Sequence, residues 1–213
     1  AMRRHDLVWL DPQAPWQVLT AGADARLRAW AQARLQFVVA RRDRASDEHQ
    51  VRFGVPLPLA EHRQRLSLRV APSAVLRCAP PPPLAEVAAD IGPAWRERLH
   101  GLVTVTASLP VAPRVFGSAA WQHLTGLPYL HDDSDLDLLF EVADTQHADQ
   151  IVAVLQHHER QHPLRLDGEL RFPGDRAINW REYASGAKRV MVKGNDACWL
   201  VPREALAAWK VAA

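Results

Sequence analysis

Four consecutive prolines at residues 80–83 limit the folds open to this chain of 213 residues. Proline fixes φ and disfavours helix in the residue before it, so the run predicts a stiff, extended connector. It is the best domain boundary in the sequence. We therefore expect a smaller N-terminal α+β module at residues 1–79, followed by a larger domain at residues 80–213.

The composition is that of an ordinary globular protein, with 48% apolar and 23% charged residues. A net charge of +2 does not require nucleic acid as a partner. The cysteines Cys78 and Cys198 are too few and too distant for a disulfide framework or a zinc site, so we expect a reducing cytoplasm. The sequence contains no apolar stretch long enough to span a bilayer, and we expect no membrane partner.

Hydrophobic periodicity predicts helices and strands on both sides of the proline run. Expected helices are residues 23–35, 84–90, 94–100, 119–125, 145–158 and 202–209. Expected strands are residues 7–10, 36–40, 66–70, 75–77, 136–142, 164–172, 177–180, 189–193 and 197–201, the first of them alternatively a loop. Residues 51–58 are expected to form a strand that passes into a proline-broken loop.

The stretch at residues 115–140 carries the strongest functional signal. Gly117-Ser118 opens a predicted helix, whose N-terminal amides can bind an anion. Asp135 and Asp137 begin a buried strand and share one of its faces, where two carboxylates repel unless a cation lies between them. Asp-X-Asp alone is as well explained by a solvated acidic turn, but the upstream Gly-Ser turn favours a metal that clamps a phosphate chain.

A third carboxylate is expected from the strand at residues 164–172, where Asp167 and Glu169 occupy the polar face. Glu169 is slightly favoured because Gly168 allows close approach of backbone and ligand. An exposed ladder of charges, satisfied by Arg165 and Arg171, explains the same pattern nearly as well.

Several other groups carry weaker signals. His158 and His162 have the spacing of a helical metal pair, but no third ligand is evident, and cations at a helix C-terminus have their own electrostatic reason. Lys193 suits a phosphate contact and a solvated position equally. The arginine-rich N-terminal part, including Arg41 and Arg42, is mostly a solvated surface, with a receiving face for phosphates or an acidic protein as the alternative. Trp121 and Trp180 are expected in the core.

Val115-Phe116-Gly117-Ser118, followed by residues 134–139, resembles the nucleotidyltransferase superfamily with its DNA polymerase β-like fold. Nearly the whole chain is similar to the phosphoribosyl-dephospho-CoA transferase family of the malonate decarboxylase system. The similar segments are residues 5–8, 38–42, 117–129, 134–139, 166–169, 179–182 and 192–193.

The resemblance implies an α+β fold with a nucleotidyltransferase-like mixed sheet and flanking helices. It also implies Mg²⁺-dependent transfer of phosphoribosyl-dephospho-CoA from a triphosphate donor to a serine of the apo acyl carrier subunit, with release of pyrophosphate. Asp135 and Asp137 match the family's essential aspartates, while the third ligand, Asp167 or Glu169, stays open. Substrate binding is assigned to Gly117, Ser118, Ser134, Arg42 and Lys193.

Two other functions suit the same sequence. One is an ATP-dependent adenylyltransferase of the same superfold, acting on a small molecule or a protein, because a fold does not fix a substrate. The other is a non-catalytic adaptor, against which the two intact aspartates argue.

Overall fold

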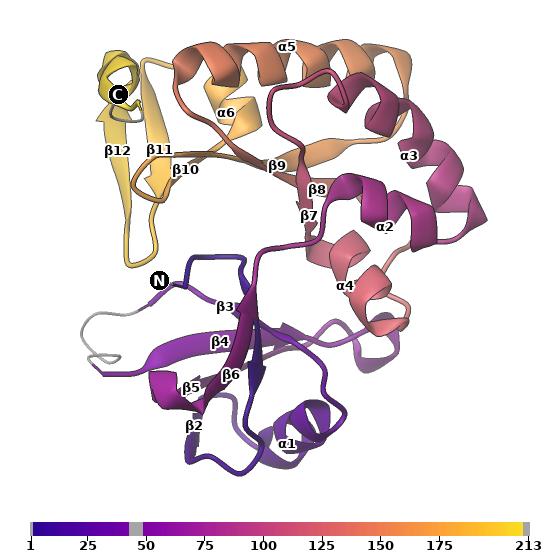
Figure 1. The fold of residues 1–213 in the computed structure, drawn as a ribbon, viewed down its shortest axis with the longest axis vertical. Coiled ribbons are helices and arrows are strands. Elements are labelled where there is room, and N and C mark those ends of the chain that lie inside the picture. The colour runs from indigo at the N-terminus through magenta and orange to yellow at the C-terminus, as the bar shows by residue number, and fades with distance from the viewer. Residues whose placement is uncertain (1, 43–48, 211–213) are drawn as a thin grey trace. The chain divides into compact units, whose positions relative to one another are not determined.

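The computed structural model describes residues 2–42 and 49–210, which form two compact units (Figure 1). The N-terminal unit comprises Ala1–Pro81 with Asn195–Ala197, and the C-terminal unit comprises Pro82–Gly194 with Cys198–Ala213. Each unit has a six-stranded sheet of its own, and helices accompany both sheets. The expected mixture of helices and strands is therefore confirmed.

The N-terminal unit is an antiparallel sheet in the order β2-β5-β4-β3-β1-β6. Alternation buries one face of it, as in β4, where Val51, Phe53 and Val55 are buried and the residues between them are half-buried. Its elements are β1 (Leu7–Leu10), β2 (Trp16–Val18), α1 (Asp24–Gln32), β3 (Phe37–Val39), β4 (Val51–Pro56), η1 (Leu59–Glu61), β5 (Arg65–Val70), η2 (Pro72–Ala74) and β6 (Val75–Ala79). The three-residue β2 escaped prediction because it is too short to show a period.

Several arginines of this unit bind its own groups. Arg26 donates two hydrogen bonds to Glu61, at 2.9 and 2.6 Å, and lowers the pKa of that carboxyl. Arg28 donates to the carbonyl oxygen of Pro12, and Arg77 lies over the ring of Trp9. Part of the arginine-rich sequence therefore stabilises the unit that contains it.

The C-terminal unit is a mixed sheet in the order β12-β11-β10-β9-β8-β7, in which only the pair β8–β9 is parallel. The helix α5 makes the crossover between these two strands, as a parallel pair requires. The elements of this unit are α2 (Leu84–Asp90), α3 (Pro93–Thr106), β7 (Arg114–Phe116), α4 (Gly117–Thr125), β8 (Leu136–Glu141), α5 (Thr145–Gln161), β9 (Leu166–Phe172), β10 (Arg176–Asn179), α6 (Trp180–Ala184), β11 (Arg189–Lys193), β12 (Cys198–Pro202) and η3 (Arg203–Ala208).

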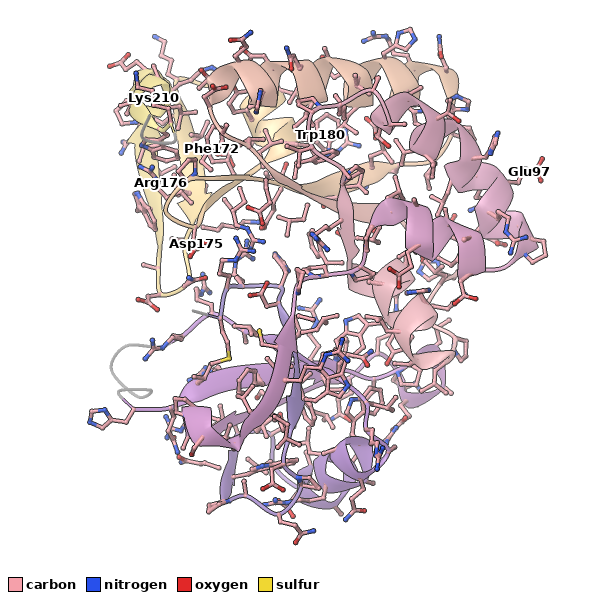
Figure 2. All side chains as sticks on the ribbon, viewed as in Figure 1. Glu97, Phe172, Asp175, Arg176, Trp180 and Lys210 are labelled. Carbon is pink, nitrogen blue, oxygen red and sulfur yellow. The ribbon has the colours of Figure 1, made fainter. Side chains whose placement is uncertain are left out.

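The second sheet has an apolar face and a polar face. Leu138 of β8 and Leu170 of β9 belong to one buried core with Ile151 and Leu155 of α5. Figure 1 shows α5 and α6 along this apolar face. Trp180 lies in the core beneath α5, as expected, while Glu97 of α3 points outward (Figure 2). The acidic side chains of β8 and β9 consequently lie on the opposite face.

Element boundaries differ from the predicted ones where a capping residue or a turn intervenes. The predicted strand at residues 177–180 ends at Asn179, whose side chain begins α6 at Trp180. The closing helix is a 3-10 helix, and α3 continues to Thr106. Among the described residues, no helix is long and apolar enough to cross a bilayer.

His158 of α5 is a buried histidine whose environment favours the uncharged imidazole. Its side chain is 1% exposed and stacks on His162, with ring centroids 4.2 Å apart. Its Nε2 has no hydrogen-bond partner among the described residues. Burial is the main cause that lowers the pKa of His158, and the charge of His162 lowers it further. The expected stabilisation of a helix C-terminus by cations therefore does not apply to His158.

This environment predicts acid sensitivity. A histidine with a lowered pKa in the folded state contributes stability above its unfolded pKa of about 6.5, and this stability is lost as the pH falls. We expect the urea concentration at half-unfolding to be lower at about pH 5.5 than at about pH 7.5. The variant His158→Leu should show a weaker dependence on pH. The exposed His100 of α3, which does not contribute to the shift, supplies the control: His100→Leu keeps the parent's profile. Indistinguishable profiles for the two variants would contradict this assignment.

Candidate functional site

The site begins where β7 ends and α4 starts. Asp137 of β8 pairs with Phe116 of β7, so its side chain lies beside the next residue, Gly117. Gly117 has a φ of +66°, and a Cβ built on it would lie only 1.9 Å from Asp137 Oδ2. Only glycine fits this position without displacing the carboxylate. The structure thus brings Asp137 to the Gly117-Ser118 turn, at the N-terminal end of α4.

The parallel pair β8–β9 adds a second carboxylate. Asp137 and Asp167 are direct register partners, and paired residues of adjacent strands project to the same face. Asp167 Oδ1 accepts hydrogen bonds from Gly168 N at 2.7 Å and from Asn179 Nδ2 at 2.8 Å. Asp167 is therefore a fixed carboxylate next to Asp137.

Gly168 is required for a different reason from the one predicted. Its φ is +135°, and a Cβ there would lie 1.9 Å from the carbonyl oxygen of Leu138. The close neighbour is thus the backbone of β8. That Gly168 also favours Glu169 as a ligand stays a prediction.

Glu169 lies one pair further along the strands, opposite Leu139. Its side chain is 4% exposed, and Lys193 Nζ lies 3.1 Å from Glu169 Oε1. Lys193 is therefore not a purely solvated side chain, because it forms an ion pair with Glu169. A buried carboxylate needs such a partner, and this ion pair gives Glu169 a role without a metal. Because Asp167 is the register partner of Asp137, it is favoured as the third metal ligand. A metal-binding role for Glu169 stays a prediction.

The polar face of β9 is not an exposed ladder. Arg171 is 4% exposed and is bound by Glu141, its partner in the register, with Nη2 2.5 Å from Oε1. Glu169 is likewise buried, and the partner found for it is Lys193. The alternative of a solvated ladder satisfied by Arg165 and Arg171 is therefore wrong at these two positions.

The remaining predicted residues are placed as follows. Asp135 is half-buried between a turn and the first residue of β8. Ser134 is buried, and its Oγ accepts a hydrogen bond from His131 N at 3.0 Å, so its side chain closes that turn. Ser118 is half-buried in the first turn of α4. Arg42 belongs to the N-terminal unit, and its assignment to the substrate stays a prediction.

The donor set suits magnesium best when substrate phosphates complete it. Within residues 2–42 and 49–210, no group of three His, Cys, Asp or Glu side chains is arranged to hold a metal. Magnesium is commonly bound by one or two carboxylates plus substrate phosphates. Asp137 and Asp167 are two such carboxylates, and the start of α4, where helix amides can bind an anion, lies next to Asp137.

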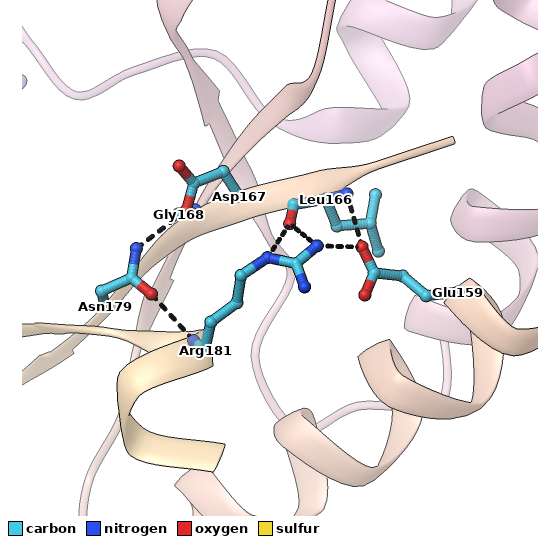
Figure 3. Close-up of polar contacts among 6 residues, drawn as sticks. All are labelled: Glu159, Leu166, Asp167, Gly168, Asn179 and Arg181. Carbon is cyan, nitrogen blue, oxygen red and sulfur yellow. Dashed lines mark hydrogen bonds and ion pairs between the residues drawn. The ribbon is translucent and has the colours of Figure 1, made fainter. Parts of the chain in front are cut away.

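Chemical reasoning on the sequence missed Asn179. Its Oδ1 accepts hydrogen bonds from Arg181 N and Glu182 N, and its Nδ2 donates to Asp167 (Figure 3). The available signal was a helix-start pattern, Asn179 followed three residues later by Glu182. Treating residue 180 as strand concealed it.

Comparisons with known proteins agree with this architecture. Two family models match: the phosphoribosyl-dephospho-CoA transferase MdcG N-terminal domain over residues 3–81 and the corresponding C-terminal domain over residues 83–204. No solved structure matches significantly.

Three relatives, each named phosphoribosyl-dephospho-CoA transferase, illustrate the range of similarity. The protein from Xanthomonas campestris pv. campestris (strain 8004) is 48% identical over 95% of both chains. The protein from Bradyrhizobium diazoefficiens is 36% identical over 94% of this chain and 90% of its own. The protein from Azotobacter vinelandii is 32% identical over 92% of this chain and 91% of its own. With both units matched and the similarity extending over nearly the full length, this chain belongs to the phosphoribosyl-dephospho-CoA transferase family.

Proposed function

We propose that this protein transfers the phosphoribosyl-dephospho-CoA group from triphosphoribosyl-dephospho-CoA to a serine of the apo acyl carrier subunit of malonate decarboxylase, releasing pyrophosphate. Membership of the family supports the reaction. We place the reaction in the cytoplasm. We also propose a nucleotidyltransferase fold for the C-terminal unit, because its sheet combines a Gly-Ser helix start after β7 with acidic residues on β8 and β9.

One observation carries this proposal: Asp137 Oδ2 occupies the place of the missing Gly117 side chain. A phosphate bound by the amides at the start of α4 would therefore lie beside a carboxylate. Two negative groups so close repel each other unless a cation separates them. The arrangement thus suits a metal-bound polyphosphate better than a lone anion.

The residues of this chain have distinct tasks in the proposed reaction. The start of α4, with Ser118, binds and orients the donor phosphates. Asp137 and Asp167 would hold Mg²⁺, with Asp135 as a further ligand, and Mg²⁺ supplies positive charge that stabilises the phosphoryl oxygens in the transition state. Lys193, which is paired with Glu169, would supply positive charge for binding the donor phosphates.

The chemical step is a displacement at the α-phosphorus of the donor. The carrier serine oxygen forms a bond to this phosphorus, and the bond from phosphorus to the oxygen bridging to the β-phosphate breaks. Pyrophosphate leaves with the bonding electron pair, and the serine proton passes to a base, for which Asp135 is our candidate. A phosphodiester links the group to the carrier.

Asp137→Asn should reduce transfer by about 100-fold or more, because the amide keeps the shape of the carboxylate but loses its charge. The control is Asp133→Asn, the same change at an exposed residue of the preceding turn. The measurement is mass spectrometry of the apo carrier subunit after incubation with the protein, the triphosphoribosyl donor and Mg²⁺. Full transfer by a well-folded Asp137→Asn variant would contradict the assignment.

The same assay separates the rival functions. Modification of the carrier or of a small molecule with ATP, in place of the dephospho-CoA derivative, would indicate an adenylyltransferase. Binding of the carrier without Mg²⁺-dependent pyrophosphate release from any donor would indicate an adaptor.

Gly117→Ala should lower transfer by about 100-fold, because the new Cβ displaces the Asp137 carboxylate by more than an ångström. Gly126→Ala is a matched control at the other end of α4, with a φ of +69° and no atom within 4 Å of the place that its Cβ would take. Both variants strain the backbone, and Gly117→Ala adds the clash with Asp137, so its melting temperature should fall at least as far as that of Gly126→Ala. Equal activity of the two variants would rule out the contact as a functional constraint.

The hypothesis for Arg41 and Arg42 predicts an effect on substrate affinity. Replacing both with Glu should raise the KM for the donor or for the carrier protein, and most strongly at low salt. The same double change at two exposed arginines, Arg63 and Arg65, is the control. Unchanged KM values for both substrates would remove these arginines from the binding surface.

A further inference from the structure

We propose that Asn179 is the positioning residue that aims the Asp167 carboxylate at the metal and donor site. The inference rests on the proposed function, and it assigns a task to the segment Asn179–Glu182, which neither the metal nor the phosphates use directly. It stands on three sets of contacts, made by Asn179, by the Asp167 carboxylate and by the backbone of Leu166 just before it (Figure 3).

Asn179 uses both ends of its side-chain amide. Oδ1 accepts hydrogen bonds from Arg181 N at 2.9 Å and Glu182 N at 3.3 Å, which caps the start of α6. Nδ2 donates to Asp167 Oδ1 at 2.8 Å. A flipped amide would place Nδ2 against two N–H donors, so the network leaves Asn179 one orientation. The helix start thereby fixes the direction of the bond to Asp167.

Asp167 is left with one oxygen to offer. Gly168 N and Asn179 Nδ2 both donate to Oδ1, which orients the carboxylate plane. Oδ2 is then the atom that Asp167 can present to a cation shared with its register partner, Asp137. A metal ligand oriented by an outer hydrogen bond in this way is a general feature of metal sites.

The backbone next to Asp167 is held by the same segment. Arg181 Nε and Nη2 donate to the carbonyl oxygen of Leu166, at 3.0 and 2.7 Å. Arg181 also binds Glu159 of α5, and Glu159 Oε1 accepts a hydrogen bond from Leu166 N at 2.7 Å. Both backbone polar groups of the residue before Asp167 are therefore fixed by α5 and α6. Rotation of the Asp167 side chain is the freedom that remains, and the hydrogen bonds from Gly168 N and Asn179 Nδ2 restrict it.

The informative variant is Asn179→Ser. Serine caps a helix about as well as asparagine, but its short hydroxyl does not reach Asp167. Asn179→Thr serves the same purpose if the serine variant expresses poorly. Asp144→Ser is the matched control, because Asp144 caps α5 by accepting a hydrogen bond from His147 N at 2.9 Å and has no place in the candidate site. All these variants keep a capping side chain.

The measurement is a titration of the full-length protein with Mn²⁺, followed by electron paramagnetic resonance without donor or carrier. We expect Asn179→Ser to weaken Mn²⁺ binding by about 10-fold or more. Its melting temperature should fall no further than that of Asp144→Ser, whose Mn²⁺ affinity should equal the parent's. Asp167→Asn is the reference variant: it removes the proposed ligand, so its Mn²⁺ affinity should fall at least as far as that of Asn179→Ser.

Each outcome decides a definite point. Parent-like Mn²⁺ affinity in Asn179→Ser would overturn the positioning role, whatever the activity of the parent. Parent-like affinity in Asp167→Asn would overturn it as well, because the ligand to be positioned would be absent. A parent that binds Mn²⁺ through Asp167 but modifies no carrier would contradict the proposed function and leave the role of Asn179 intact.

Discussion

The contact between the Asp137 carboxylate and the bare Cα of Gly117 is the constraint on which the candidate site depends. It joins the end of β7, the start of α4 and the middle of β8 at one point. Any side chain at residue 117 would separate the helix N-terminus from the acidic strand. A helix N-terminus stabilises anions and an acidic strand stabilises cations, so we expect this contact to create a joint site for a polyphosphate and its metal.

The parallel pairing of β8 and β9 extends that point into a site. It sets Asp167 opposite Asp137, while Gly168 brings the two backbones together. On the same polar face, Arg171 is held by Glu141 at the far end of the pair. Toward the beginning of the two strands, the register pair consists of two carboxylates, Asp137 and Asp167. A divalent cation is the group that we expect to bind between them.

Much of this arrangement was predictable from the sequence, because local patterns determine it. The alternating strand at residues 164–172 and the Gly117 turn follow from spacing and composition. The register of β8 on β9 is different, since it depends on the length and docking of α5, and no local pattern reports it. For that reason the choice between Asp167 and Glu169 was open, and the burial of Arg171 was unexpected. Asn179 was missed because a helix of five residues is too short to show a period.

The most direct test of the central claim is the position of a bound metal. Crystals of the protein grown with Mn²⁺ and a non-reactive donor analogue should give an anomalous scattering peak at coordination distance, about 2.1 Å, from carboxylate oxygens of both Asp137 and Asp167. The analogue's phosphates should lie at the start of α4. A peak at another cluster, or an analogue bound away from Gly117, would contradict the account.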